Sequence, residues 1–299
     1  MKFDNVLVTG SAGLLGRHVV RELAPRCNVT GFDRQPSPDD VAARIGDVTD
    51  RAAVRAACEG QDAVVHVAAM PNIWSGSGEQ IVTVNVTGTW NVLQSAEEAG
   101  VRRVILCSSD SVLGYTVMSG SLLPPRYAPV DAAHPLQPTD PYALSKLLGE
   151  RIGESFVQRG RMEVVALRPV FVLYPEMYGE VKMRGADPAH YRGPMAGGPS
   201  AAGGGPLWHY IDPRDAARAF RLALEVPHFP DFAAFYLSAT STLAPEPTLE
   251  RLQRVLGQAV ELRQPDAYDR NPFAPLYDIA PARDVLGFEA EHDLRGVVA

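Results

Sequence analysis

The sequence predicts an α/β fold in which a doubly wound parallel sheet carries helices on both faces. Two observations support this prediction. Short apolar segments alternate with helix-like segments through the first half of the 299-residue chain, a rhythm typical of βαβ units. The second half loses this rhythm, since residues 122–141 are rich in proline and residues 175–206 are rich in Gly, Pro and Ala. We therefore expect one sheet with a smaller interleaved carboxyl-terminal lobe.

The elements follow in order along the chain. Short apolar segments predict strands at residues 5–9, 28–32, 63–68, 103–108, 163–168 and 234–238. Longer segments between them predict helices at residues 14–23, 50–58, 79–99, 141–159, 212–225 and 248–256. No period is evident in residues 175–206, and a structureless segment of this length is usually a functional loop or lid. We expect residues 1–167 plus about 211–238 to form the cofactor domain, and residues 168–210 plus about 239–299 to form the substrate lobe.

Composition and charge limit the classes of protein to consider. With 46% hydrophobic and 21% charged residues, the chain has an ordinary globular composition and is long enough to bury a large core. The formal net charge is −7, and there is no dense Lys/Arg cluster of the kind that nucleic-acid binders carry. Nucleic acid is therefore not an expected partner.

Neither a membrane nor a metal is expected. No run of about 18 apolar residues occurs, and the short apolar run at the N-terminus is followed at once by glycines, unlike a signal peptide. Cys27, Cys58 and Cys107 are scattered, with no metal-like pairing. A reducing cytoplasm is the simplest setting for such cysteines. Cys107 lies in an apolar run and is expected to be a buried small hydrophobe.

A glycine-rich turn joins the first predicted strand to the first predicted helix. Its glycines have the spacing G-x-x-G-x-x-G. Such glycines permit a tight turn and a close approach of the backbone to a pyrophosphate, which the helix N-terminus then stabilises. We therefore expect a Rossmann-type dinucleotide site. The residues of this turn expected to contact the cofactor are Gly10, Ala12, Gly13, Leu14, Leu15 and Gly16.

Acidic residues follow the second predicted strand. Asp33 lies where a carboxylate can accept hydrogen bonds from both ribose hydroxyls of an adenosine and repel a 2′-phosphate. NAD is therefore expected rather than NADP, although an arginine such as Arg34 can accommodate that phosphate. Further on, Asp47 and Val48 are also expected at the cofactor. Asp47 is interpreted either as a contact to the adenine edge or as the cap of the next helix.

A tyrosine and a lysine lie four residues apart at the start of the predicted helix at 141–159. Tyr142 and Lys146 therefore share one helical face. A phenol titrates near 10, and a neighbouring ammonium lowers that pKa by favouring the phenolate. The pair can then act as a general acid or base at a carbinol oxygen.

Further motifs accompany this pair in a fixed order. After the glycine turn and Asp33 come Gly46-Asp47, His66-Val67-Ala68-Ala69, Asn85-x-x-Gly88-Thr89, Ser108-Ser109, Tyr142-x-x-x-Lys146 and Arg168-Pro169. In this order they make the chain similar to the extended short-chain dehydrogenases/reductases, the NAD-dependent epimerase/dehydratase family. The resemblance is specific as far as about Arg168 and weaker beyond it. It implies a Rossmann-type sheet, one NAD per chain and a homodimer formed through the two long helices.

The resemblance also implies individual roles. Tyr142 is the proton donor or acceptor, and Lys146 binds the nicotinamide ribose and lowers the pKa of the tyrosine. Ser109, five residues before Gly114 in the family's S-S-x-x-V-Y-G pattern, hydrogen-bonds the substrate oxygen. Asn85 supports the proton relay. The backbone of Val67, Ala68 and Ala69 lines the cofactor groove, and His66 is interpreted as a structural histidine.

The substrate is narrowed by what differs from the family. Dehydratases carry an Asp-Glu pair after the catalytic hydroxyl, whereas this chain has Asp110 and Ser111. Nucleotide-sugar enzymes clamp a diphosphate with an arginine, in a segment where this chain has Trp208 and His209. These differences favour a smaller, free substrate over a nucleotide sugar.

The chain is also similar to the uronate dehydrogenases, a subgroup that oxidises free uronic acids with NAD. The similarity rests on Ser108-Ser109 followed by Gly114-Tyr115, and on Pro175-Glu176. That subgroup holds the substrate carboxylate with a downstream arginine, and the candidates for this role here are Lys182, Arg184 and Arg192. The residues expected to line the sugar pocket are Asn72, Trp74, Ser109, Asp110, Tyr178 and Trp208.

The function expected from the sequence is an NAD-dependent oxidoreductase that transfers a hydride at a carbinol or carbonyl carbon of a free sugar or sugar acid. One alternative is a UDP-sugar 4-epimerase, in which the same tyrosine and NAD oxidise and reduce one carbon. The second is a non-catalytic NAD-sensing or scaffold protein, which would not need Ser109, Tyr142 and Lys146 together.

Overall fold

The computed structural model describes residues 3–37, 40–114, 124–186, 194–195, 198–199 and 208–298. Within these residues, seven strands form one parallel sheet in the order β10-β7-β5-β4-β1-β2-β3. The strands are β1 (Asn5–Thr9), β2 (Asn28–Asp33), β3 (Ala42–Ile45), β4 (Ala63–His66), β5 (Arg103–Cys107), β7 (Glu163–Pro169) and β10 (Ala233–Leu237). The predicted α/β fold with a doubly wound sheet is confirmed.

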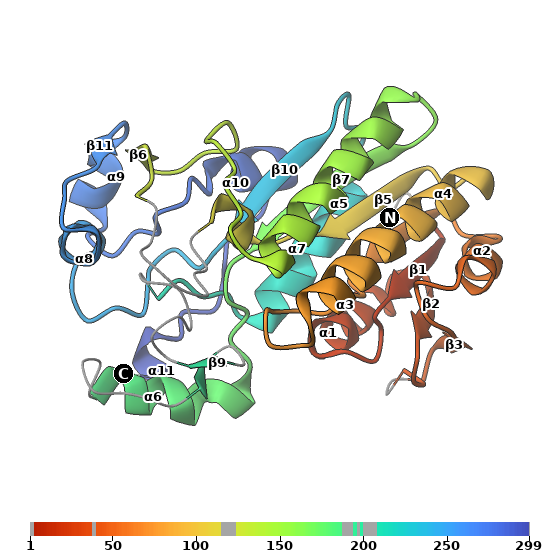
Figure 1. Cartoon of the computed structure of the whole chain (residues 1–299), viewed down its shortest axis with the longest axis horizontal. Coiled ribbons are helices and arrows are strands. Elements are labelled where there is room, and N and C mark those ends of the chain that lie inside the picture. The colour runs from red at the N-terminus through yellow and green to blue at the C-terminus, as the bar shows by residue number, and fades with distance from the viewer. Residues whose placement is uncertain are drawn as a thin grey trace.

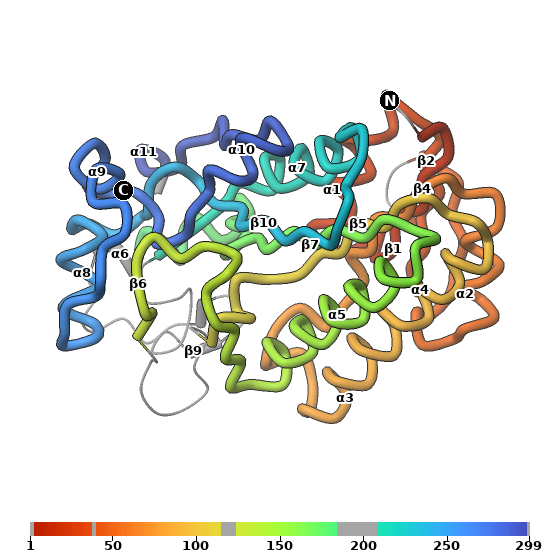
Figure 2. The backbone as a smooth tube through the Cα atoms, turned by 90° about the horizontal axis from the view of Figure 1, so that it is seen from above, coloured from red at the N-terminus to blue at the C-terminus, as the bar shows by residue number. Residues whose placement is uncertain are grey.

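Helices cover both faces of this sheet. In Figure 2, α1 (Leu14–Leu23), α7 (Pro213–Glu225) and α10 (Ala280–Leu286) lie above the strands. The helices α2 (Arg51–Cys58), α3 (Gly78–Val82), α4 (Gly88–Glu98) and α5 (Pro141–Gln158) lie below them. One buried apolar cluster forms on each face, so every central strand is covered on both sides.

The apolar pattern of each element explains this packing. In β1, Val6, Leu7 and Val8 are fully buried and alternate between the two apolar clusters. In α1, the buried residues recur at helical spacing and face the first cluster, which includes Val19 and Leu23. Burial of each such side chain contributes roughly 1.5–3 kcal/mol of transfer free energy, which favours this pairing of strand and helix.

The sheet order reverses beside β1. β1 pairs with β2 on one side and with β4 on the other. The connections that follow β1 and β4 therefore run to opposite sides of the sheet. This leaves a crevice between them at the carboxyl ends of the two strands. Ligands of doubly wound sheets bind at such a point, and the residues that follow β1, β2, β4 and β5 all reach it.

One predicted helix is interrupted. The segment predicted as a single helix at 79–99 consists of α3, a π-helical turn at Thr83–Thr87 (η1) and α4. A π turn inserts a wider step into a helix and often occurs at functional sites. The periodicity of the sequence does not reveal it, because the apolar positions on both sides remain close to helical spacing.

The remaining elements lie toward the carboxyl edge of the sheet, at the left of Figure 1. They are β6 (Tyr127–Ala128), η3 (Pro175–Met177), α6 (Tyr178–Ala186), β8 (Pro194–Met195), β9 (Gly198–Pro199), α8 (Thr248–Leu256), β11 (Glu261–Leu262), α9 (Pro265–Arg270) and α11 (Arg295–Val298). The expectation of a structureless segment at 175–206 is wrong for residues 175–186, which form a 3-10 turn and a helix. Part of that segment lies outside the described residues.

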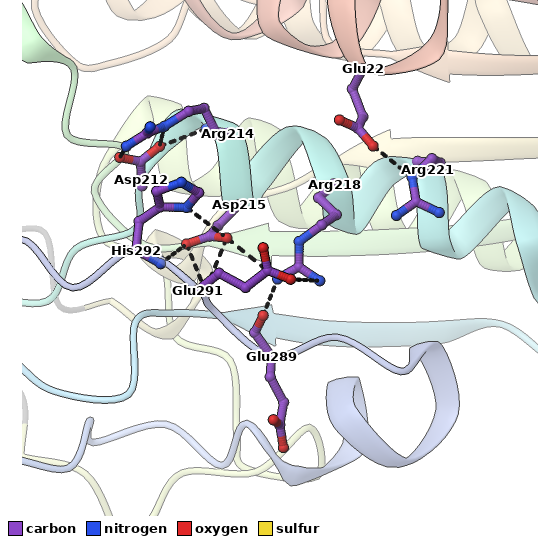
Figure 3. A network of polar contacts seen from close by, with 9 residues as sticks. All are labelled: Glu22, Asp212, Arg214, Asp215, Arg218, Arg221, Glu289, Glu291 and His292. Carbon is purple, nitrogen blue, oxygen red and sulfur yellow. Dashed lines mark hydrogen bonds and ion pairs between the residues drawn. The ribbon is translucent and has the colours of Figure 1, made fainter. Parts of the chain in front are cut away.

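A network of polar contacts fixes the carboxyl-terminal segment to α7 (Figure 3). The buried carboxylate of Asp215 accepts hydrogen bonds from the backbone nitrogens of Glu291, at 3.1 Å, and His292, at 2.9 Å. One turn further along α7, the guanidinium of Arg218 donates to the carbonyl oxygen of Glu289. Because the buried carboxylate of Asp215 needs hydrogen-bond donors, its bonds to these two backbone nitrogens fix where the carboxyl-terminal segment crosses α7.

The described residues also bear on the expectations about membranes, metals and cysteines. None of the helices in these residues has both the length and the apolar character needed to cross a bilayer. No cluster of three His, Cys, Asp or Glu side chains in the same residues is placed to hold a metal ion. The three cysteines are free thiols; Cys58 is buried, whereas Cys107 is only partly buried and lines the cleft described below.

Candidate active site

The turn after β1 brings glycines to positions where a side chain does not fit. A Cβ atom on Gly16 would overlap the carbonyl oxygen of Gly10, and one on Gly10 would lie 2.6 Å from the Ala68 nitrogen. Gly10 also has a φ of +73°, which favours glycine. Because Gly13 begins α1 without a side-chain cap, the first N–H groups of that helix remain available to an anion.

Asp33 ends β2 beside this turn. One carboxylate oxygen accepts from the Ala12 nitrogen at 3.1 Å and the other from the Gln35 nitrogen at 3.2 Å. Both bonds hold the carboxylate at the edge of the crevice, next to Arg34. This is the position at which a ribose diol is expected.

Asp47 lies nearby, and one of its two interpretations is wrong. The cap of α2 is Asp50, whose carboxylate accepts from the nitrogens of Ala52 and Ala53. Asp47 instead accepts from the backbone nitrogen of Thr49 at 2.9 Å and from its hydroxyl at 2.8 Å, and these bonds lower the pKa of its carboxyl. Asp47 therefore remains ionised at the wall of the crevice.

One cleft of about 1170 Å³ joins the glycine turn to the predicted catalytic residues. It extends from Asp33 along the carboxyl ends of the strands to Tyr142 and Lys146. The predicted site residues that line it are Gly10, Ala12, Gly13, Leu14, Leu15, Gly16, Asp33, Arg34, Asp47, Val48, Val67, Ala68, Ala69, Asn72, Trp74, Ser109, Asp110, Tyr142 and Lys146. The motifs that are separate in the sequence thus face one space.

Ser109, Tyr142 and Lys146 come from two elements. The carboxylate of Asp140 caps α5 by accepting from the Ala143 nitrogen at 2.8 Å, which starts the helix just before Tyr142. Lys146 lies one turn later, and its ammonium nitrogen is 5.7 Å from the centroid of the Tyr142 ring. Ser109 follows β5, and its hydroxyl accepts from the Ser111 nitrogen at 3.2 Å. All three side chains line the same end of the cleft.

The expected lowering of the tyrosine pKa is not found in this structure. Burial raises the pKa of Tyr142 above its ordinary value of 10, and the carboxylates of Asp110 and Asp140 act in the same direction. The ammonium of Lys146 donates to the carbonyl oxygen of Cys107 at 2.7 Å rather than to the phenol. A hydrogen bond with Ser109 lowers the pKa of Tyr142, but burial outweighs it, and burial lowers the pKa of Lys146 as well.

Asn85 does not line the cleft and acts on it through other groups. It lies in the π turn, where its amide oxygen accepts from the Met70 nitrogen at 2.8 Å. Its amide nitrogen donates to the Met70 carbonyl oxygen at 3.1 Å and to the Ser145 hydroxyl at 2.9 Å. The hydroxyl of Ser145 in turn donates to the carbonyl oxygen of Tyr142. Asn85 thereby ties a wall of the cleft to the helix that carries the tyrosine.

Two predicted substrate residues lie away from the cleft. Trp208 is buried with the Arg251 guanidinium 4.8 Å from its ring, and Tyr178 packs at the start of α6 against the apolar cluster that contains Val181. Neither is among the described residues that line the cleft, so their place in a sugar pocket stays a prediction. Spacing alone does not show which way an isolated aromatic side chain faces.

Of the three cations considered for a substrate carboxylate, the structure describes the side chain of Lys182. Lys182 is exposed on α6 and does not line the cleft. Arg192 and Tyr115 lie outside the described residues, and so does the side chain of Arg184.

Several residues that line the cleft were missed by sequence reasoning. His209, Leu276 and Tyr277 come from the carboxyl-terminal half, and the Leu276 nitrogen donates to Nε2 of His209 at 2.9 Å. Burial lowers the pKa of His209 to about 3, so the ring is neutral. The resemblance to the family continues only weakly into this half of the sequence, and it does not indicate which of these residues contact the site.

His66 has the structural role expected of it. Its Nδ1 lies 2.7 Å from the Thr9 hydroxyl and its Nε2 lies 3.2 Å from the Thr89 hydroxyl. Burial lowers the pKa of His66 to about 3. The ring is therefore a neutral bridge between β1 and α4.

A buried ion pair supports the catalytic end of the cleft from behind. Arg168 donates to both carboxylate oxygens of Glu150, at 2.9 and 2.8 Å, and to the Tyr236 hydroxyl at 2.9 Å. The Ser108 hydroxyl, next to Ser109, also donates to Glu150. The side chains of both charged residues are less than 5% exposed, so each charge depends on the other for compensation.

Asp110 faces the cleft beside Ser109. Its carboxylate accepts from the Tyr277 hydroxyl at 2.8 Å and from the Ser109 hydroxyl at 3.3 Å. Burial raises the pKa of Asp110 to about 6, against the opposing effect of these hydrogen bonds. Asp110 is thus a carboxylate at neutral pH in an environment that disfavours its charge.

This raised pKa predicts a change in stability. A folded-state pKa of about 6, above the ordinary value of 3.8, means that stability is lost as the pH rises between these values. The Asp110→Asn variant, which has no charge to desolvate, should raise the free energy of unfolding at pH 7.5 by about 1–3 kcal/mol and change it little at pH 4. Urea denaturation at the two pH values checks this; an equal change at both would contradict it.

With the geometry established, comparison with known proteins places the chain in a family. Residues 6–232 match the model of the NAD dependent epimerase/dehydratase family. The chain belongs to this family. The match covers the sheet from β1 almost to β10 and includes the glycine turn, Ser109, Tyr142 and Lys146. The resemblance seen in the motifs is confirmed, and NAD is the cofactor of the family.

Two curated relatives are enzymes of sugar oxidation. The chain is 33% identical over 167 residues to the L-arabinose 1-dehydrogenase (NAD(P)(+)) of Haloferax volcanii, covering 54% of this chain and 65% of the relative. It is 29% identical over 171 residues to the uronate dehydrogenase of Pseudomonas syringae pv. tomato, covering 56% of this chain and 58% of the relative. The alignments thus span less than two thirds of each relative.

One solved structure has a similar fold along nearly the whole chain. It is a short-chain dehydrogenase/reductase superfamily protein from Agrobacterium tumefaciens with bound NAD. The TM-score is 0.69 at 26% identity, and the match covers 97% of this chain and 94% of that one. The carboxyl-terminal elements, which the family model does not reach, therefore also follow the fold of this relative.

Proposed function

We propose that this protein is an NAD-dependent dehydrogenase that oxidises a carbinol of a free sugar or sugar acid, using Ser109, Tyr142 and Lys146. The observation that carries the proposal is the single cleft that joins the glycine turn and Asp33 to these three side chains. A dinucleotide held at one end of that cleft brings its reactive ring to the other end. The sugar relatives support the substrate class.

The residues present fit NAD. The backbone of the glycine turn has room for a pyrophosphate because no side chain covers the start of α1. The carboxylate of Asp33, held by two backbone nitrogens, suits the adenosine ribose. When bound, NAD would supply the hydride acceptor for the carbinol carbon and become NADH.

The chain's own residues would handle the proton. In our proposal the Ser109 hydroxyl orients the carbinol oxygen, and Tyr142 removes the proton from that oxygen as the carbon loses its hydride. Lys146 lies on the same helical face, where its ammonium would bind the nicotinamide ribose. Asn85 is a positioning residue, since its bonds to Met70 and Ser145 hold the cleft wall against α5.

One assay distinguishes the proposed dehydrogenase from the two alternatives, an epimerase and a sensing or scaffold protein. Purified protein is incubated with NAD and, separately, with aldoses, uronic acids and UDP-sugars, and the absorbance of NADH is followed. NADH formed with a free sugar or sugar acid supports the dehydrogenase. Isomerised UDP-sugar without net NADH would show an epimerase, and NAD binding without any turnover would favour a sensing or scaffold protein.

The preference for NAD over NADP depends on Asp33. Replacement of Asp33 with Ala should weaken NAD binding by about 10-fold or more, because it removes hydrogen bonds from a charged group to the ribose diol. NADP binding should weaken less or improve, because the repulsion of the 2′-phosphate is also removed. Isothermal titration with both cofactors checks this; equal losses would show that Asp33 is not the ribose ligand.

We also propose that the protein forms a homodimer through α4 and α5. Trp90 on α4 and Leu144 and Leu148 on α5 are large apolar side chains that remain exposed in the single chain, by 42%, 42% and 37%. Exposed apolar residues gathered on neighbouring helices are typical of an interface.

The division into a cofactor domain and a substrate lobe, with the boundaries given in the sequence analysis, likewise remains a proposal.

A further inference from the structure

The substrate end of the cleft contains a carboxylate that the proposed chemistry does not use. Asp110 lies beside Ser109, the residue proposed to orient the carbinol, and both line the cleft with Tyr142. Proton transfer in the proposed reaction needs only the tyrosine. A half-buried carboxylate in such a position therefore requires another explanation.

Its existing hydrogen bonds come from two side chains and from the backbone. One oxygen accepts from Tyr277 at 2.8 Å and the other from Ser109 at 3.3 Å, and the backbone nitrogens of Asp110 and Ser111 also stabilise its charge. The bond from Ser109 is the longer of the first two, and it is released when the Ser109 hydroxyl turns to the carbinol oxygen, as proposed. Because Asp110 also lines the cleft, that acceptor site is then available to a donor that enters from the cleft.

The orientation of this carboxylate is fixed from behind. The Tyr277 ring stacks on Tyr236 with a centroid distance of 4.9 Å and an interplanar angle of 15°, and it lies 4.7 Å from the His209 ring. The Tyr236 hydroxyl is bonded to Arg168 of the buried ion pair. The packed aromatic rings thus fix the Tyr277 hydroxyl, and this hydroxyl in turn fixes the Asp110 carboxylate, as expected of a preorganised binding group.

At the substrate end, the described residues offer one cation against the carboxylate of Asp110. Among the described residues that line the cleft, the cationic side chains are Arg34, at the adenosine end, and Lys146, which donates to the neutral carbonyl oxygen of Cys107, so that its charge is not cancelled there. His209 is neutral, as shown above. The charges of Lys146 and Asp110 offset each other, so a second negative charge at this end would meet the carboxylate without a further cation in these residues, whereas a neutral hydroxyl would find an acceptor.

From this arrangement we infer that Asp110 is a specificity residue: it accepts a hydrogen bond from the hydroxyl next to the oxidised carbon and so selects neutral polyhydroxylated sugars over anionic ones. The inference rests on the proposed function. It narrows the substrate class from free sugars and sugar acids to neutral aldoses. When the Ser109 hydroxyl holds the reacting oxygen, its neighbour Asp110 meets the adjacent hydroxyl of a vicinal diol.

The test compares D-galactose with two sugars that each differ from it at one position. D-galactose and D-galacturonic acid differ only in the neutral or anionic group at C6, and 2-deoxy-D-galactose lacks the hydroxyl next to C1. For the wild-type protein we expect kcat/KM for galactose to exceed the value for each of the other two by about 10- to 100-fold, as for loss of a hydrogen bond to a charged group. Identification of the product as a C1 lactone shows that the neighbouring hydroxyl has been probed.

Two variants then separate the charge from the hydrogen bond. In Asp110→Ala, galactose and 2-deoxygalactose should be used about equally well, because the acceptor is gone. In Asp110→Asn, the amide oxygen still accepts but the charge is gone, so the ratio of kcat/KM for galactose to kcat/KM for galacturonate should fall by about 10-fold.

The matched control is Asp131→Asn. Asp131 also accepts from a tyrosine hydroxyl, that of Tyr127 at 2.6 Å, but it does not line the cleft. Both ratios should stay as in wild type.

The possible failures can be told apart. If the wild type reduces NAD with no free sugar, the proposed function is wrong. If it oxidises galactose but prefers galacturonate, or if the 2-deoxy penalty persists in Asp110→Ala, the function stands and the role of Asp110 is wrong. Titration of each variant with NAD shows that it is folded, since Asp110 lies at the opposite end of the cleft from Asp33.

Discussion

Replacement of Tyr142 with Phe should lower kcat by about 10²–10⁴-fold while NAD still binds. The change removes only the hydroxyl, which in our proposal takes the proton from the carbinol oxygen, and general acid–base catalysis contributes on this order. The ring remains on α5 and preserves the packing of the helix start. The measurements are single-turnover formation of NADH and the dissociation constant of NAD, both at saturating sugar.

Tyr127 offers a matched control for this change. Its hydroxyl is also hydrogen-bonded and its side chain is buried, but it lies outside the cleft. Tyr127→Phe should therefore keep kcat within a few-fold of wild type. Near-normal turnover in Tyr142→Phe would show that another group transfers the proton.

Replacement of Arg168 with Met should destabilise the fold by about 3–5 kcal/mol. It leaves the Glu150 carboxylate buried without its two guanidinium bonds, and a buried charge that has lost its partner carries nearly the full desolvation cost. The expected result is a lower midpoint of urea unfolding at pH 7.5.

The double variant tests the reason for this loss. In Arg168→Met with Glu150→Gln, no unpaired charge remains, so much of the lost stability should return. If the double variant is as unstable as the single one, the shape of the arginine side chain matters more than its charge.

The first half of the fold was predictable because its signals are local. β1 and α1 were predicted at their observed bounds, since a fully buried parallel strand is a continuous apolar segment and its helix follows at once. The π turn at Thr83–Thr87 and the exposed edge strand β3 were not predicted. Neither carries a periodic apolar signal, because the first changes only the helical pitch and the second has no buried face.

The candidate site likewise has a part that local motifs predict and a part that depends on packing between distant segments. All the predicted cofactor residues line the cleft because they lie in short motifs at the ends of consecutive strands. Trp208 and Tyr178 are not in the lining of the cleft as described, and the sequence could not show this because the direction of a side chain depends on packing between distant segments. The Tyr277–Asp110 contact joins residues 167 positions apart, and no local pattern reveals a contact of that kind.

That separation also bears on how the protein assembles. The glycine turn, Asp33, Ser109, Tyr142 and Lys146 all lie within the first half of the chain, whereas the contact of Tyr277 with Asp110 joins residues 167 positions apart. Closing so long a loop is slow compared with forming neighbouring βαβ units. We therefore expect a refolding chain to bind its cofactor before it acquires the sugar discrimination that we propose for Asp110.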